Sequence, residues 1–212
     1  MNNSYATVGY YICKFTDCPP FLNVVTEKFI SISDCLCEHE PHIFLCHGWK
    51  PNGDKNDYIR LFSSHADYLQ MSEEISQLFR RNLFATDGRF CRKDDAIFFY
   101  KKYFNKPSKY ILVSVSTKEQ YIKTFDGGFQ IEKNMTLNNE EEIIGCDIIG
   151  WDISGFHSFL CNSLNEEFLD IEFNSYGLLN LPYTEAEQMA LKIKGMGEPV
   201  DWIPVILHQI KI

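Results

Sequence analysis

Five runs of β-branched and aromatic residues constrain most strongly what this chain can fold into. They occupy residues 6–15, 109–116, 143–153, 156–161 and 202–210, and stretches of very different length separate them. Such runs are typical of β-strands. KYILVSVS at 109–116 alternates most cleanly, and Ser154 and Gly155, between the third and fourth runs, predict a hairpin turn. We therefore expect a sheet built from these strands.

Helices are predicted between and after the strands. In residues 72–84, Ser72 is a candidate N-cap ahead of apolar residues at helical spacing. Residues 94–104 carry acids in the first turn and lysines near the end, which matches the helix dipole. Thr184 and Glu187 form a capping box, so a further helix is expected to begin there and to end near Gly195.

The order of these elements predicts the fold class. Strands and helices interleave without a regular βαβ period, which favours α+β over a doubly wound α/β fold. The 212 residues are 45% hydrophobic and include no long linker, so we expect one globular domain over 1–212, with helices packed on a mixed or mainly antiparallel sheet. A change in charge near 126–132 divides this domain into a near-neutral N-terminal half and an acidic C-terminal half.

The N-terminal sequence bears on location. MNNSYATVGYYICKF lacks the basic and apolar regions of a signal peptide, and no run in the chain approaches the roughly 18 apolar residues of a membrane span. These features predict a cytoplasmic protein with no membrane partner. In a reducing compartment the eight cysteines are expected to be free thiols.

Charge is distributed very unevenly along the chain. The formal net charge is −9, with 16 basic and 14 acidic residues in 1–125 but 4 basic and 15 acidic residues in 126–212. This acidic excess repels nucleic acid and favours a cationic protein partner, although it could also serve solubility alone. The basic residues between 80 and 102 are expected to pair with the chain's own acidic half. The acids predicted to bind a partner are Glu140, Glu141, Glu142, Asp152, Glu166, Glu167 and Asp170.

A cysteine- and histidine-rich stretch, DCLCEHEPHIFLCH at 34–47, raises the question of a metal site. A zinc ion could be held by Cys35, Cys37, His39 or His42, and Cys46. The spacing is C-x-C with H-x₂-H, however, whereas structural zinc sites pair ligands as C-x₂₋₄-C and H-x₃₋₅-H. We therefore interpret these thiols as buried side chains and keep zinc as an alternative. The phosphate-binding and dinucleotide-binding motifs are absent from the sequence, so no cofactor is expected.

A second group of reactive residues lies in GCDIIGWDISGFHSFLC at 145–161. Cys146, Asp152 and His157 could form a small Cys/His-dependent hydrolase or transferase site if the fold brings them together. Ser154 lies in DISGF rather than in the G-x-S-x-G motif of a hydrolase nucleophile. An enzyme of this kind is therefore the alternative hypothesis, and we expect no enzymatic activity.

The C-terminal part resembles a class of known proteins. GWDISGFHSFLCNSL, then FNSYGLL, the T-E-A-E helix and the W-x-P strand at Trp202 and Pro204 are similar to the tails of immunity proteins of bacterial polymorphic or contact-dependent toxin systems. The resemblance implies a role and no catalytic residues, because immunity proteins have many unrelated folds. It implies binding to a basic toxin domain, whose active site or substrate groove would be covered. A subunit of a larger assembly is a further alternative.

Overall fold

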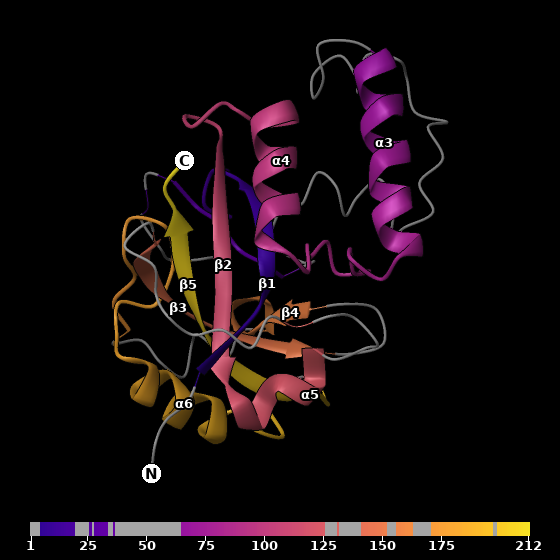
Figure 1. The fold of residues 1–212 in the computed structure, drawn as a ribbon. Helices are drawn as coiled ribbons and strands as arrows, with labels where there is room; N and C mark the ends of the chain where they lie inside the picture. Colours follow the sequence, from indigo (N-terminus) through magenta and orange to yellow (C-terminus); the bar gives the residue numbers. More distant parts are fainter. Residues whose placement is uncertain are drawn as a thin grey trace.

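A five-stranded antiparallel sheet forms the centre of the protein (Figure 1). The computed structural model describes residues 5–19, 26, 28–33, 36, 65–125, 131, 141–151, 156–162, 171–196 and 199–212. The strand order is β1-β2-β5-β3-β4, and every neighbouring pair is antiparallel. The bounds are β1 (Tyr5–Lys14), β2 (Tyr110–Lys118), β3 (Glu141–Trp151), β4 (Phe156–Ser158) and β5 (Asp201–Ile210). The predicted α+β class is confirmed.

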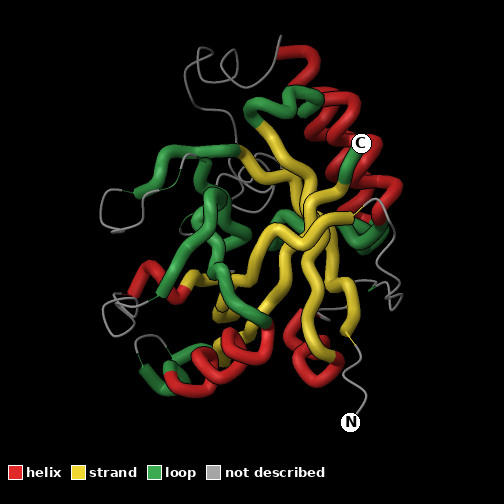
Figure 2. The backbone as a smooth tube through the Cα atoms, turned by 90° about the vertical axis from the view of Figure 1, so that its left-hand side faces the viewer, coloured by secondary structure: helices red, strands yellow, loops and turns green. Residues whose placement is uncertain are grey.

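Helices pack against both faces of the sheet, near its two ends. They are α3 (His65–Arg80), α4 (Lys93–Tyr103), α5 (Ile122–Phe125) and α6 (Tyr183–Lys192), with short 3₁₀ turns η1 (Glu119–Tyr121) and η2 (Phe159–Asn162). α4 lies near the start of β2, and α6 lies at the opposite end of the sheet. In the side view, the curled strands run between the helices at these two ends (Figure 2). None of the described helices is long and apolar enough to cross a membrane.

The core follows the alternation of the strands. Tyr10, Ile12 and Leu112 face α3 and α4 in one buried cluster, while Cys146 and Trp202 face α6 in another. The intervening residues, such as Tyr11, Val113 and Leu207, form the core on the opposite face of the sheet. Both faces of the central strands are therefore buried, as the all-buried pattern from Tyr110 to Thr117 in β2 reflects.

A buried ion pair fixes the bulge in β1. Arg89 and Asp87 are 3% and 2% exposed, with 3.4 Å between Nε and Oδ2. The Arg89 guanidinium donates hydrogen bonds to the carbonyl oxygens of Val8 and Phe125, each at 2.7 Å. Its aliphatic stem fills the space where Gly9 has no side chain. Arg89 therefore joins the β1 bulge to the C-terminal end of α5.

Several predicted elements are confirmed. The strands expected at 6–15, 109–116 and 202–210 are β1, β2 and β5, and the helix expected at 94–104 is α4, with Asp94 and Asp95 in its first turn. The runs at 143–153 and 156–161 give β3 and β4, but β4 ends at Ser158 and a 3₁₀ turn follows.

Two predicted helix starts are wrong. α3 begins at His65, and Ser72 lies inside it, because Tyr68 and Met71 are also buried and extend the apolar face toward the N-terminus. At α6 the N-cap is Pro182, which makes no side-chain cap hydrogen bond. Glu187 does not complete a capping box, because Lys118 of β2 binds its carboxylate. The same helix ends at Lys192 rather than near Gly195.

Candidate functional site

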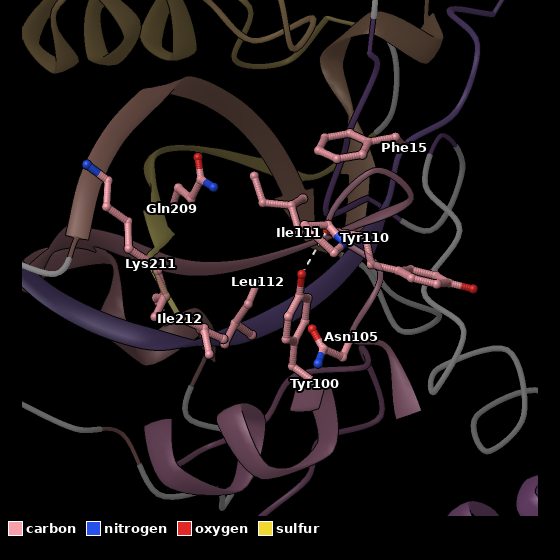
Figure 3. Close-up of a pocket in the computed structure, with 11 residues that line it drawn as sticks. Phe15, Tyr100, Asn105, Tyr110, Ile111, Leu112, Gln209, Lys211 and Ile212 are labelled. Atoms are coloured by element: carbon pink, nitrogen blue, oxygen red, sulfur yellow. Dashed lines mark hydrogen bonds between the residues drawn. The ribbon is translucent and has the colours of Figure 1, made fainter. Parts of the chain in front are cut away.

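A pocket opens where two central strands separate. β2 pairs with β1 as far as Tyr110, but its register with β5 ends at Val113 opposite Gln209. The gap between β2 and the end of β5 forms a pocket of about 270 Å³ (Figure 3). Its lining residues are Phe15, Tyr100, Asn105, Pro107, Tyr110, Ile111, Leu112, Gln209, Ile210, Lys211 and Ile212.

The polar groups of this strand-split pocket limit its chemistry. The Tyr100 hydroxyl donates to the Tyr110 carbonyl oxygen at 3.1 Å, and Lys211 is turned toward Glu142 at 2.8 Å. The amides of Asn105 and Gln209 line the remainder. Among these lining residues there is no carboxylate side chain, histidine or cysteine, so they offer hydrogen bonds and apolar contact without an acid–base pair.

A cluster of ionisable and polar side chains lies on the same sheet face, beneath the first turn of α4. Glu141 of β3 accepts hydrogen bonds from Lys93 of α4 at 2.8 Å and from Ser114 of β2 at 3.0 Å. The side chains of Lys93 and Glu141 are only 17% and 11% exposed. Because α4, β2 and β3 each supply one member, this Glu141 cluster depends on the whole fold.

His208 of β5 belongs to the same region. It pairs with Ser114 across the sheet and is 2% exposed, and neither ring nitrogen has a hydrogen-bond partner within the described residues. Burial lowers the pKa of His208, and the negative charge of Glu141 opposes that change. The histidine is therefore held in its neutral form next to a charged pair.

The Glu141 cluster does not have the geometry of a serine hydrolase. In a Ser-His-acid triad the serine hydroxyl donates to the histidine, which carries its proton away. Here the Ser114 hydroxyl donates to Glu141 instead. Sequence reasoning missed this cluster, because its members are far apart in the chain; the only local signal is a histidine inside the apolar run VILHQI.

The structure places two of the three residues of the alternative enzyme site, Cys146 and His157, apart from each other. His157 of β4 lies opposite Gly150, four residues along β3 from Cys146, a distance of about 13 Å along a strand. Burial, and to a lesser degree Asp147, raises the pKa of Cys146 to about 12. The thiol is therefore not a ready nucleophile at neutral pH. Asp152 lies outside the described residues.

The acids predicted to bind a partner have different surroundings. Glu141 is turned inward, as described above, whereas the side chain of Glu142 is 59% exposed. The hydrogen bond from Lys211 lowers the pKa of Glu142. The other predicted positions lie outside the described residues; they are Glu140, Asp152, Glu166, Glu167 and Asp170.

The possible zinc ligands also lie outside the described residues; they are Cys35, Cys37, His39, His42 and Cys46. In the part of the chain that is described, no group of three or more histidine, cysteine, aspartate or glutamate side chains could hold a metal ion. The zinc alternative stays a prediction.

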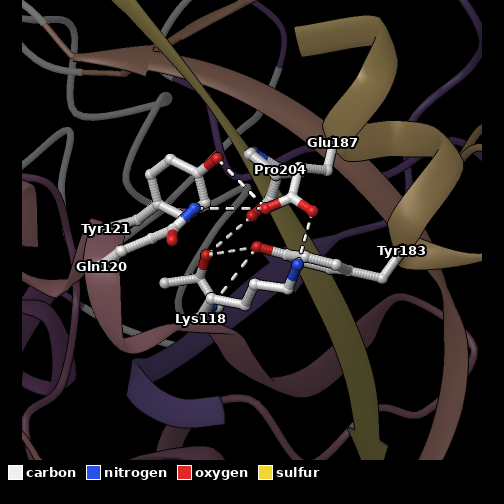
Figure 4. A network of polar contacts seen from close by, with 7 residues as sticks. Lys118, Gln120, Tyr121, Tyr183, Glu187 and Pro204 are labelled. Atoms are coloured by element: carbon white, nitrogen blue, oxygen red, sulfur yellow. Dashed lines mark hydrogen bonds and ion pairs between the residues drawn. The ribbon is translucent and has the colours of Figure 1, made fainter. Parts of the chain in front are cut away.

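A second polar network lies at the opposite end of the sheet (Figure 4). The Glu187 carboxylate of α6 accepts hydrogen bonds from Lys118, Gln120 and Tyr121. The Tyr183 hydroxyl shares a hydrogen bond with Thr117 and accepts one from the Lys118 amide. Burial raises the pKa of Tyr183, so it remains protonated. This network ties α6 to β2 and is a structural contact.

The basic stretch between 80 and 102 pairs mainly with nearby acids. Its ion pairs between described residues are Arg80 with Glu73, Arg89 with Asp87, Arg92 with Asp95, Lys93 with Glu141, and Lys102 with Glu74. Only the Lys93 pair reaches the acidic half of the chain among these. Between described residues the expected pairing with that half is therefore seen for Lys93, while helix neighbours and the α3–α4 contact supply closer carboxylates to Arg80, Arg92 and Lys102.

Comparison with known proteins gives no match: no family model fits the chain, and neither a curated protein nor a solved structure matches it.

Proposed function

We propose that this protein is an immunity-type protein, which binds a cationic toxin domain and neutralises it by covering its active site or substrate groove. The observation that carries the proposal is the net charge of −11 in residues 126–212, which the rest of the chain does little to cancel. Between described residues, two ion pairs join lysines of the N-terminal half to that acidic half, Lys93 with Glu141 and Lys118 with Glu187.

The distribution of the remaining charge supports a partner surface that includes the most acidic segments of this half. The exposed acids of the described C-terminal half are Glu142, Glu172, Glu185 and Asp201, and its exposed bases are Lys192, Lys194 and Lys211. These charges nearly balance. The segments of 126–212 outside the described residues contain eight acids and one lysine, which is most of the excess. A partner attracted by this charge would therefore meet residues in those segments.

Charge complementarity would act mainly on the speed of association. Opposite charges steer two proteins together and raise the association rate, and added salt screens the attraction. Buried apolar contacts would then supply most of the affinity. The proposal thus predicts tight binding whose association rate falls as the salt concentration rises.

The alternative enzyme has less support. Its cysteine is buried with a raised pKa, and its histidine lies opposite a residue four positions along the strand from that cysteine. The strand-split pocket contains none of the residues proposed for that enzyme. We therefore place binding ahead of hydrolysis.

Co-expression tests the proposed function directly. The product of the adjacent gene is expressed alone and together with this protein, and growth is measured. We expect the neighbour to arrest growth and this protein to restore it. Failure to restore growth, or binding whose association rate is independent of salt, would contradict the proposal.

A pair of charge variants locates the surface. One variant neutralises predicted partner acids and combines Asp152→Asn, Glu166→Gln, Glu167→Gln and Asp170→Asn. The control neutralises exposed acids elsewhere and combines Glu172→Gln, Glu185→Gln and Asp201→Asn. We expect the first variant to slow association about tenfold or more, since steering changes rates by about 10–10³, and the control to keep a rate close to wild type.

A further inference from the structure

The outer edge of β3 at Glu141–Ile143 differs from the rest of the sheet. β3 pairs with β5 along its whole length, but with β4 only from Ile149 to Trp151. Between these parts, Leu179 pairs with Cys146, and the Asn174 side chain donates to the Ile144 carbonyl oxygen. Within the described residues no strand or bridge lies against the outer edge at Glu141–Ile143, which we call the β3 edge.

Two of the three side chains at the β3 edge, those of Glu142 and Ile143, are exposed to solvent. Ile143 is 58% exposed, although it belongs to a strand whose next apolar residue, Ile144, is buried. Glu142 is similarly exposed, and the ion pair that it forms is with Lys211, itself 61% exposed. Exposed ion pairs contribute little and exchange readily, because water screens both charges. The carboxylate of Glu142 is therefore available to another cation.

The β3 edge favours one kind of occupant. An extended peptide can add to a sheet edge through main-chain hydrogen bonds, while its side chains select the sequence. A second copy of the chain would bring the acids 140–142 against each other, and like charges on paired strands are destabilising. A basic segment would instead place its cations beside Glu142.

Charged residues and bulges commonly protect a sheet edge against pairing with another strand, and β3 has a bulge between Ile143 and Gly145.

We propose that the β3 edge is the docking strand for a basic, extended segment of the partner protein. The segment would add beside β3, with an apolar side chain against Ile143 and a lysine or arginine replacing Lys211 as the partner of Glu142. This inference rests on the proposed function for the identity of the partner, but the edge itself can be tested alone.

The first experiment uses a defined probe and matched variants. The probe is a short, end-blocked peptide of alternating lysine and valine, and the control peptide alternates glutamate and valine. Binding is measured by NMR, from the shifts of the Glu142 and Ile143 amides. We expect Ile143→Asp and Glu142→Lys to weaken binding about tenfold or more.

The control variants change equally exposed side chains elsewhere. Leu191 of α6 is 64% exposed, and the side chain of Asp201, at the other end of β5, is 82% exposed. Leu191→Asp and Asp201→Lys change the net charge of the protein by the same amounts as the test variants, so they change its non-specific attraction for the peptide equally. These controls should leave the affinity within about twofold of wild type. An equal loss in the controls, or equal binding of the glutamate peptide, would overturn the inference.

Two further readouts separate the possible outcomes. Self-association in sedimentation that Glu142→Lys abolishes would assign the edge to a second copy and overturn the inference. In the growth assay, rescue by wild type and equal rescue by Ile143→Asp would refute the β3 edge while the proposed function stands. Specific binding of the basic peptide without any rescue would refute the proposed function while the docking strand stands.

Discussion

Replacement of Arg89 by methionine tests how the buried ion pair stabilises the fold. Methionine keeps much of the aliphatic stem that packs over Gly9, but removes the guanidinium. The Asp87 carboxylate, 2% exposed, would then keep a hydrogen bond from the Tyr11 hydroxyl at 3.0 Å and lose its cation. The carbonyl oxygens of Val8 and Phe125 would lose their donors.

The magnitude follows from these losses. Removing one partner of a buried ion pair costs about 3–5 kcal/mol, because the other charge stays buried without compensation. Two hydrogen bonds from a charged donor, at about 1.5–3 kcal/mol each, give about 3–6 kcal/mol, which overlaps that range. We therefore expect Arg89→Met to lower the free energy of unfolding by about 4 kcal/mol. Burial is the largest single effect and disfavours the charged guanidinium, but the neighbouring groups, with the charge of Asp87 first among them, together outweigh it and the pKa of Arg89 is raised.

The assay is urea unfolding followed by tryptophan fluorescence, with two comparisons. Arg80→Met removes the same side chain from an exposed pair with Glu73, at 3.1 Å, and should cost less than about 1 kcal/mol. The double variant Arg89→Met with Asp87→Asn leaves neither charge and should cost less than the sum of the single changes. An Arg89→Met cost below about 1 kcal/mol, or strict additivity, would refute the reasoning.

Three further changes follow from the packing and the pKa shifts. Gly9→Ala should lower the free energy of unfolding by about 1–3 kcal/mol, because the new Cβ would lie 2.1 Å from Cγ of the immobilised Arg89; no loss in urea unfolding would contradict this. Glu187→Gln leaves the Lys118 ammonium, 15% exposed, without its carboxylate and should cost about 1–2 kcal/mol in the same assay. Burial lowers the pKa of His208 below its ordinary 6.5. As the pH falls, this histidine is therefore protonated at a higher pH in the unfolded chain than in the folded protein. The free energy of unfolding thus decreases below about pH 6.5, by at most about 1.4 kcal/mol per pH unit. His208→Leu should remove this part of the pH dependence of stability. If the variant and the wild type show the same change in the free energy of unfolding with pH, His208 is excluded as its source.

The sequence predicted the strands and α4 because residues within each of these elements determine its structure. KYILVSVS at 109–116 is apolar enough to be buried on both faces, and it forms β2. The first-turn acids and last-turn lysines of α4 need no distant partner. The capping box failed for the opposite reason, because the competing partner of Glu187 is Lys118, 69 residues earlier in the chain. A local sequence pattern cannot show that a lysine from a distant strand will pair with a glutamate of the helix.

The candidate site depended on information that the sequence order does not contain. Ser114, Glu141 and His208 meet only because β5, the last strand, lies between β2 and β3. The register also places His157 opposite Gly150, and so four residues along β3 from Cys146, which the sequence order did not reveal. Charge asymmetry was visible in the sequence, but not that Glu141 is internal and Glu142 exposed. That difference follows from strand alternation, because Glu141 and Glu142 are consecutive residues in regular register with β5.

The two ends of the sheet differ in how their ionisable side chains are paired, and this difference indicates where to look for function. At the α6 end, Glu187 accepts three hydrogen bonds. The Tyr183 hydroxyl there is hydrogen-bonded to Thr117 and to the Lys118 amide. At the other end, β2 and β5 separate, and the buried imidazole of His208 has no partner within the described residues. Ile143 is also exposed there. Proteins depart from complete packing and pairing mainly where function requires it. Binding experiments should therefore begin at the β3–β5 end.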